Sequence, residues 1–229
     1  MASRFRGIGD GFRSAAFTLA KCASRTLGPI IPSQNETGVA ARLRQRFFVM
    51  PGTEVVRVLD ALETAGVHPI VMGGWGVDAL LGEQTRPHRD LDLLVAAGDE
   101  ITRANETMAA LRYRFLLEEV DTDSFFPRRV VWRDRLGRTA DLHPFIAAYA
   151  PIVADPREPR AGSIGGRGVV CLSPQVQLTC IERTFRAREA RREAHAVRLR
   201  DAQDVRELCT RFGLPLPARY ATPCGSAGR

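Results

Sequence analysis

Two aspartates, Asp90 and Asp92, stand two residues apart inside a strand-like run. Side chains two apart in a strand share a face, so both carboxylates point the same way. The intervening apolar side chains point to the other face: Leu91, Leu93 and Val95. Two carboxylates on one face repel each other unless a cation lies between them, and Mg²⁺ prefers such oxygen ligands. The spacing predicts a divalent metal site, with a solvated, half-exposed strand as the alternative.

A glycine pair, Gly73 and Gly74, lies where a short apolar run gives way to a helical pattern. Glycines at such a junction let backbone N–H groups approach a phosphate at a helix N-terminus. The polar loop that follows contains Arg86, which is a candidate bidentate phosphate contact or else a surface arginine. His88, in the same loop, orients Asp90 or contacts phosphate, unless it makes a structural hydrogen bond. Together these residues favour a phosphate and metal site.

A third carboxylate, Asp141, lies in the second arm of a predicted hairpin. The segments 129–132 and 138–143 alternate as strands do, and they flank the turn 134–137. Asp141 shares a face with Thr139 in that arm. An exposed strand aspartate is the alternative, but the motif upstream leads us to interpret Asp141 as the third carboxylate of the site.

The elements that must position these residues are helices and strands in alternation. The first part of the pattern predicts a helix from a Thr53 cap to Gly66, a strand over 69–72, a short helix over 76–81 and a strand over 90–95. The second part predicts a helix from an Asp99 cap to about 111, a strand over 115–120 and the hairpin. After a Pro- and Gly-rich loop over 147–168, Ser173 and Pro174 begin a helix to about 188, and another spans 197–212.

The string GGWGVDALLG followed by TRPHRDLDLLV, and later ADLHPF, resembles the aminoglycoside 2''-adenylyltransferases and the related lincosamide nucleotidyltransferases. Those families belong to the polymerase-beta-like nucleotidyltransferase superfamily. The resemblance implies an α+β fold with a short mixed sheet flanked by helices, and a small C-terminal helical element. It departs from the family after Cys180, where Ile181 stands in place of a histidine, whereas Arg200, Asp201 and Asp204 match a later K-D-x-x-D element.

The activity implied is Mg²⁺-dependent transfer of AMP from ATP to a hydroxyl of a small molecule, an aminoglycoside- or lincosamide-like antibiotic. Asp90 and Asp92 would bind the metal, and Asp141 would complete a second metal site and accept the proton of the acceptor hydroxyl. Gly73, Gly74, Arg86 and His88 would bind the nucleotide. The alternatives are transfer to RNA or protein, and a nucleotide-binding protein of the same fold that has lost turnover.

The domain organisation follows composition. Residues 1–49, rich in Arg, Ser and Ala, are expected to be a disordered extension, a targeting segment or sequence preceding the true start. We expect a nucleotidyltransferase domain over 50–170, the helical element over 171–213 and a flexible tail over 214–229.

The net charge of +7 lies mainly in residues 1–49, which hold eight basic and two acidic residues. The remainder holds 33 − 8 = 25 basic and 26 − 2 = 24 acidic residues, a net of +1. A neutral body argues against nucleic acid as a partner, and we expect a cytoplasmic protein without a membrane span. No sequence feature sets an oligomeric state. The acid-rich run of Glu118, Glu119, Asp121 and Asp123 is a candidate pocket for a polycationic acceptor, or else a surface loop.

Overall fold

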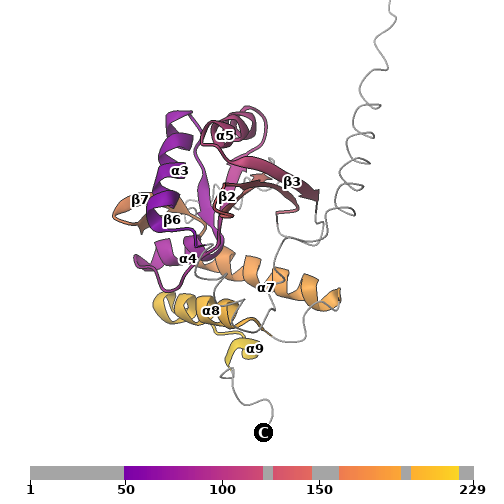
Figure 1. Cartoon of the computed structure of the whole chain (residues 1–229). Coiled ribbons are helices and arrows are strands. Elements are labelled where there is room, and N and C mark those ends of the chain that lie inside the picture. The colour runs from indigo at the N-terminus through magenta and orange to yellow at the C-terminus, as the bar shows by residue number, and fades with distance from the viewer. Residues whose placement is uncertain (1–48, 121–125, 146–159, 192–196, 222–229) are drawn as a thin grey trace, which may run out of the picture. The chain divides into compact units, whose positions relative to one another are not determined.

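The computed structural model describes residues 49–120, 126–145, 160–191 and 197–221 (Figure 1). The order of elements is α3 (Gly52–Thr64), β1 (Ile70–Met72), α4 (Gly73–Leu81), β2 (Asp90–Ala96), α5 (Asp99–Ala110), β3 (Arg114–Val120), β4 (Arg128–Arg133), β5 (Thr139–Phe145), β6 (Arg160–Ile164), β7 (Arg167–Cys171), α7 (Pro174–Ala190), α8 (Leu199–Phe212) and α9 (Ala218–Ala221). The expected leader over residues 1–49 lies outside the described residues except for its last position.

The strands form one mixed sheet in the order β3-β4-β5-β2-β1-β7-β6. Strand β2 is parallel to β5, and β1 is parallel to β7, whereas the other neighbours are antiparallel. Helices flank this sheet (Figure 1). The fold class predicted from the sequence, a mixed sheet with flanking helices, is confirmed.

One face of the sheet packs against α3 and α5. Leu91 and Leu93 of β2 are fully buried in the same apolar cluster as Leu59 of α3 and Met108 of α5. Truncating a buried leucine of this kind to alanine costs about 2–5 kcal/mol of stability. The helical spacing of α3 and the alternation of β2 thus bury matching apolar surfaces and leave the aspartates on the opposite face.

That opposite face is bordered by α7. Leu94, which shares a face with Asp90 and Asp92, is fully buried in a second cluster with Met72. Val176 and Cys180 of α7 pack against this cluster. The helix therefore covers the apolar part of the face that bears the carboxylates.

Several helix ends match the sequence prediction, and others begin earlier. Ser173 caps α7, accepting a hydrogen bond from the Val176 N–H at 3.3 Å, and Gly213 ends α8 at a positive φ of 65°. The predicted caps Thr53 and Asp99 are wrong: α3 begins after Pro51 and α5 after Gly98. Within the described residues, no helix has both the length and the hydrophobicity to cross a bilayer.

The prediction of a loop throughout 147–168 is wrong for its C-terminal part, where β6 and β7 form a hairpin. Gly165 and Gly166 both have positive φ, as the tightest hairpin turns require. Gly162 packs so closely on α4 that a β-carbon there would meet the Ala79 carbonyl oxygen at 2.8 Å. Gly165 and Gly166 form the hairpin turn, and Gly162 allows the close contact with α4. The many glycines of this segment, which led to the prediction of a loop, are therefore part of regular structure. The part of the expected loop at 146–159 lies outside the described residues.

The expected tail from residue 214 is also structured in its first part. Helix α9 places Tyr220 in the interior with no exposed surface, and the Tyr220 carbonyl accepts a hydrogen bond from Arg206 of α8 at 2.9 Å. The buried ring and this hydrogen bond hold the short segment against α8. Residues 222–229 lie outside the described residues.

Candidate active site

The register between β2 and β5 brings the three predicted carboxylates together. The two strands are parallel, with Asp92 opposite Asp141 and Asp90 opposite Thr139. Paired residues on neighbouring strands share a face and lie about 5 Å apart. Asp90, Asp92 and Asp141, which are 49–51 positions apart between the strands, therefore form one cluster on one face, as predicted.

Burial and the charge of Asp92 raise the pKa values of the other two carboxylates. Burial, and then the charge of Asp92, raise the pKa of Asp141 well above its ordinary value, and the Arg129 guanidinium opposes this. Burial and the same Asp92 charge raise the pKa of Asp90, opposed mainly by Arg200. The cluster thus concentrates negative charge in a poorly solvated place. A cation that binds there relieves the repulsion.

Asp141 is only partly satisfied by its neighbours. Its Oδ2 accepts a hydrogen bond from Arg129 at 3.1 Å, whereas its Oδ1 is buried without a hydrogen-bond partner among the described residues. His143, two positions on, places its Nε2 at 3.4 Å from Asp92 Oδ1, and its buried Nδ1 has no partner either. Buried polar atoms without partners are rare, and a bound ligand or ion is one explanation for them.

The residues present fit a divalent cation that is also bound by phosphate. Within the described part of the chain, no three His, Cys, Asp or Glu side chains converge closely enough to hold a metal by themselves. Mg²⁺ keeps several waters and commonly takes only one or two carboxylates plus substrate phosphate oxygens. The free Oδ1 of Asp141 and the oxygen-only ligand set of the cluster suit such a partial site.

Gly73 and Gly74 are the first residues of α4, three positions earlier than the predicted start of that helix. A β-carbon on Gly73, whose φ is 64°, would collide with the Asp92 carboxylate. A β-carbon on Gly74 would collide with the ring of His88 and approach Arg86 Nη2 to 2.6 Å. The glycines are therefore required for the site to close around the N-terminus of α4. Their predicted contact with phosphate stays a prediction.

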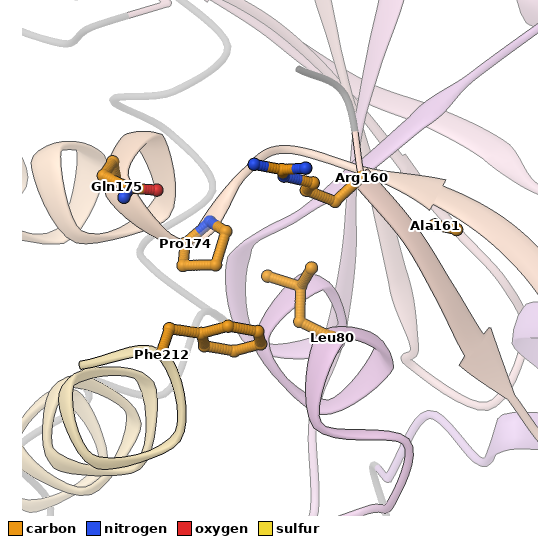
Figure 2. A pocket seen from close by; sticks show the side chains of 6 residues that line it. All are labelled: Leu80, Arg160, Ala161, Pro174, Gln175 and Phe212. Atoms are coloured by element: carbon orange, nitrogen blue, oxygen red, sulfur yellow. The ribbon is translucent and has the colours of Figure 1, made fainter. Parts of the chain in front are cut away.

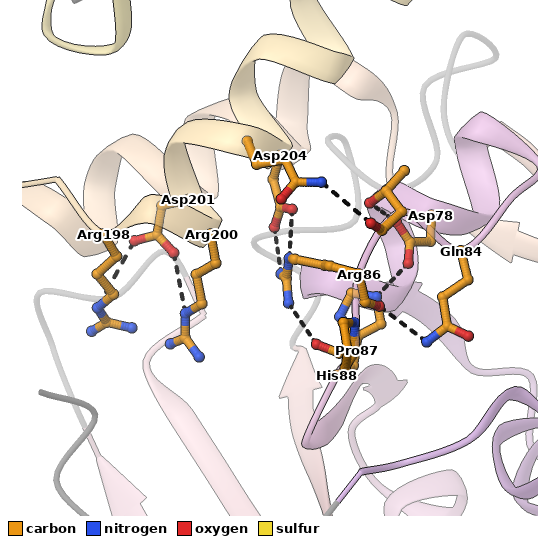
Figure 3. Close-up of polar contacts among 11 residues, drawn as sticks. Asp78, Gln84, Arg86, Pro87, His88, Arg198, Arg200, Asp201 and Asp204 are labelled. Atoms are coloured by element: carbon orange, nitrogen blue, oxygen red, sulfur yellow. Dashed lines mark hydrogen bonds and ion pairs between the residues drawn. The ribbon is translucent and has the colours of Figure 1, made fainter. Parts of the chain in front are cut away.

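The loop residues Arg86 and His88 make contacts inside the protein (Figure 3). Arg86 donates two hydrogen bonds to the carboxylate of Asp204 in α8, at 2.8 and 2.6 Å. His88 pairs through Nε2 with Asp78 of α4, and its ring lies 4.7 Å from that of Trp75. For His88 the sequence left a structural hydrogen bond open, and the geometry supports it. For Arg86 the alternative was a surface arginine, whereas its side chain is only 16% exposed and is paired with Asp204. The contact of both residues with nucleotide remains a prediction.

These contacts tie three segments into one unit, which we call the clamp: Asp78 of α4, Thr85, Arg86 and His88 of the loop, and Gln203 and Asp204 of α8. Thr85 donates to the second oxygen of Asp78 at 2.6 Å, and Gln203 donates to the Thr85 carbonyl at 3.3 Å. Asp78, His88 and Asp204 are 2–4% exposed. The clamp fixes α8 against α4 and against the loop that leads into β2.

Two arginines that the sequence analysis did not place in the site lie at the start of α8 (Figure 3). Arg200 and Arg198 approach Asp201 at 3.5 and 3.9 Å. Burial lowers the pKa of Arg198 to about 10, with a smaller contribution from the charge of Arg200, while Asp201 and, less strongly, Asp90 act in the other direction. Positive charge from α8 therefore faces the carboxylate cluster. The match of Arg200, Asp201 and Asp204 to the K-D-x-x-D element was the signal in the sequence.

A cavity of about 350 Å³ lies elsewhere, lined by Leu80, Arg160, Ala161, Pro174, Gln175 and Phe212 (Figure 2). None of the predicted site residues lines it. Leu80 is near the C-terminal end of α4, roughly 10 Å along the helix axis from Gly73. We assign this cavity no part in the chemistry of the carboxylates.

Residues 54–197, more than half of the chain, match the family model described as aminoglycoside-2''-adenylyltransferase. The chain belongs to this family. Members of the family are nucleotidyltransferases, so the resemblance predicted from GGWGVDALLG, TRPHRDLDLLV and ADLHPF is confirmed. No curated protein sequence matches the chain.

Solved structures of two antibiotic-modifying enzymes share the fold. A solution structure of the antibiotic-resistance factor ANT(2'')-Ia has a TM-score of 0.54 at 21% identity, covering 71% of this chain and 84% of that one. The lincosamide antibiotic adenylyltransferase LnuA, bound to lincomycin, has a TM-score of 0.52 at 20% identity, covering 73% and 99%. ANT(2'')-Ia in complex with adenylyl-2''-tobramycin gives 0.52 at 23% identity, covering 71% and 89%. These likenesses confirm the polymerase-beta-like fold.

Proposed function

We propose that this protein transfers AMP from ATP to a hydroxyl group of a small antibiotic-like molecule, with Mg²⁺ as the metal. The observation that carries the proposal is the register that sets Asp92 opposite Asp141, with Asp90 on the same face, in a chain of this family. Nucleotidyl transfer requires stabilisation of charge on phosphoryl oxygens more than covalent chemistry. Three clustered carboxylates beside cationic arginines meet that requirement.

The roles follow from the positions. Asp90 and Asp92 would hold Mg²⁺, which supplies charge neutralisation on the phosphate oxygens when it is bound. Asp141 would complete the site. It would also accept the proton of the acceptor hydroxyl, because a hydroxyl close to a bound metal ion gives up its proton more easily at neutral pH. The hydroxyl oxygen then forms a bond to the α-phosphorus of ATP, and the bond to the departing pyrophosphate breaks.

The nucleotide would lie at the junction of α4 and α8. Backbone N–H groups of Gly73 and Gly74 at the start of α4 suit a phosphate, because a helix N-terminus attracts anions. We assign the main cationic contacts with the triphosphate to Arg198 and Arg200, whose charges face Asp90. In this proposal Arg86 orients α8 by binding Asp204, and His88 packs against Gly74 at the start of α4. Both residues therefore position groups that contact the nucleotide, without contacting it themselves.

The test is pyrophosphate release from ATP and Mg²⁺ in the presence of lincosamides and aminoglycosides. Asp92→Asn serves as the negative control, and Asp60→Asn, which changes an exposed aspartate on α3, serves as the matched control. Release that depends on an acceptor, persists in Asp60→Asn and disappears in Asp92→Asn is the expected result. Metal-dependent ATP binding without release to any acceptor would favour a nucleotide-binding protein that has lost turnover.

A further inference from the structure

Two further groups of charged side chains differ in how completely they are paired. On the hairpin of β3 and β4, two of the four acids that the sequence suggested for a polycationic acceptor, Glu118 and Glu119, are paired with arginines of β4. The other two, Asp121 and Asp123, lie outside the described residues. The second group consists of arginines where α7 meets α8, and some of their buried N–H groups lack partners among the described residues. The second group is therefore the better candidate for a ligand site.

The end of α7 lies beside the start of α8. Leu178 and Ile181 of α7 pack against the apolar cluster that contains Ala202 and Val205 of α8. Residues 191–198 connect the two helices. Helices that are packed together and joined by a short connection run in opposite directions. The last turn of α7 is thus brought close to the first turn of α8.

Three arginines meet at this place: Arg188 in the last turn of α7, Arg198 directly before α8 and Arg200 in the first turn of α8. Figure 3 shows the side chains of Arg198 and Arg200 extending in the same direction. Burial lowers the pKa of Arg198, and the charges of Arg200 and Arg188 lower it further. The carboxylates of Asp201 and Asp90 oppose this shift without reversing it. Charges from both helices therefore act on one guanidinium group.

These guanidinium groups are poorly paired and still within reach of solvent. Arg188 Nη1 and Arg198 Nε are buried without a hydrogen-bond partner in the described part of the chain, and the Asp201 carboxylate is 3.9 Å from Arg198 Nε. The side chains of Arg198 and Arg200 are 21% and 33% exposed. An unpaired, buried and charged donor is unfavourable, and an anion that accepts its hydrogen bonds removes that cost.

The arginines adjoin the proposed position of the reacting phosphate. Burial and the charge of Asp92 raise the pKa of Asp90, and the charge of Arg200 is the main opposing influence. Under the proposed function, Asp90 and Asp92 hold the metal ion against the α-phosphate. The other two phosphates carry most of the charge of ATP, and the arginines beside Asp90 offer them cationic partners.

We propose that Arg188, Arg198 and Arg200 together bind the β- and γ-phosphates of the nucleotide, and that the same site binds inorganic pyrophosphate without a nucleoside. The inference rests on the proposed transfer reaction and adds Arg188, and with it α7, to the nucleotide site. Guanidinium groups suit this ligand because their N–H groups bind two phosphate oxygens at once.

The site has a part in the transfer step as well as in binding. The acceptor oxygen forms a bond to the α-phosphorus, and the bond from that phosphorus to the oxygen that bridges to the β-phosphate breaks. The electron pair of the broken bond stays on the departing pyrophosphate, whose added negative charge the arginines stabilise. Pyrophosphate is therefore expected to compete with ATP for the free protein.

The first arm of the experiment measures binding without turnover. The full chain with Mg²⁺ is titrated calorimetrically with inorganic pyrophosphate, orthophosphate and AMP. Pyrophosphate is expected to bind about tenfold or more tightly than orthophosphate, because it spans more of the guanidinium groups. Absence of pyrophosphate binding, or equal binding of the two anions, overturns the inference.

The second arm tests Arg188. Arg188→Gln is expected to weaken pyrophosphate binding about tenfold and to leave AMP binding unchanged, because AMP lacks both phosphates. Arg188→Lys keeps the charge without the paired N–H groups and should lose about threefold. The matched control is Arg186→Gln on the same helix, where a 69% exposed side chain pairs with Glu182 at 3.7 Å, and it should bind pyrophosphate like the unchanged protein.

The outcomes separate this inference from the proposed function. A loss of pyrophosphate and AMP binding together, or a loss of melting temperature with pyrophosphate binding intact, would show that Arg188 serves the fold. Acceptor-dependent pyrophosphate release with no effect of Arg188→Gln on pyrophosphate binding or on the KM for ATP would refute the inference and keep the function. Pyrophosphate binding that depends on Arg188, without release to any acceptor, would keep the site and refute the transfer reaction.

Discussion

The carboxylate cluster and the clamp are both charged and at least half-buried, yet they are built in opposite ways. In the cluster, Asp92 raises the pKa values of Asp90 and Asp141, so like charges face one another and one oxygen of Asp141 lacks a partner. In the clamp, both oxygens of Asp204 accept hydrogen bonds from Arg86, and both oxygens of Asp78 are paired. A region whose carboxylates lack hydrogen-bond and charge partners is suited to bind a ligand. A region whose carboxylates are fully paired is suited to hold helices in place.

The largest expected effect is on catalysis, from the cluster. Asp92→Asn removes a proposed metal ligand and is expected to lower the rate of pyrophosphate release about a thousandfold or more. The free energy of unfolding should stay the same or rise, because the variant also removes a like charge next to Asp90 and Asp141. Rate assays combined with thermal unfolding check both parts. A large loss of stability would show that the cluster serves the fold in the way the clamp does.

Substitutions in the clamp should, in contrast, lower the free energy of unfolding. Arg86→Gln or Asp204→Asn leaves a buried partner uncompensated and is expected to cost about 3–5 kcal/mol of unfolding free energy. The double variant should lose less than the sum of the single losses, because the two side chains interact directly. Urea denaturation of the four proteins measures this coupling.

The control for the clamp is the exposed pair between Arg167 and Asp60, at 2.6 Å. Breaking it with Asp60→Asn should cost at most about 1 kcal/mol, as exposed ion pairs do. If Asp204→Asn proved as mild as Asp60→Asn, the distinction between clamp and surface would fail.

Gly73 lies between the two regions, because it is the first residue of α4 and is next to the Asp92 carboxylate. A substitution at Gly73 therefore tests both regions together. Gly73→Ala introduces a β-carbon at a positive φ and into the Asp92 carboxylate. We expect a loss of about 1–3 kcal/mol in stability together with reduced turnover. Gly82→Ala is the matched control, because Gly82 has a φ of 80° but no atom within 4 Å of an added β-carbon. It should share only the backbone cost of about 1 kcal/mol and keep its activity.

The smallest effect is expected from removing residues 2–48. Met50 is fully buried and its N–H donates to the His88 carbonyl at 2.8 Å, and the shortened chain keeps this contact with the clamp loop. The shortened chain should retain both the rate of pyrophosphate release and the melting temperature. A loss in either measurement would show that the leader supports the cluster or the clamp.

Much of the cluster was predictable from the sequence because local periodicity determines it. Alternation over β2 and β5 fixes which side chains share a face, and the turn Asp134–Gly137 fixes the hairpin arm that bears Asp141. The turn forms as expected: the Asp134 carboxylate accepts a hydrogen bond from the Leu136 N–H at 2.9 Å and Gly137 adopts a φ of 81°. The caps at Ser173 and Gly213 were likewise local signals, and both are confirmed.

The clamp, the hairpin β6–β7 and helix α9 were not predictable in this way. Arg86 and Asp204 are 118 positions apart, and no pattern within a short window links them. The glycines of β6 and β7 resembled a loop because their close approach to α4 and their turn geometry appear only when the chain is folded. Tyr220 resembled a tail residue because its burial depends on α8.

The sequence by itself determined the family, the mixed sheet with its helices and the three aspartates that share a face, since each follows from motifs or from the periods of strands and helices. Only the tertiary structure decided the partners of the arginines. It directs Arg86 to Asp204, Arg129 to Asp141 and Glu119, and the arginines of α8 toward Asp90. The physical reason is that the charge of an arginine is fixed by its type, whereas its partner depends on which distant segments the packed core brings within reach.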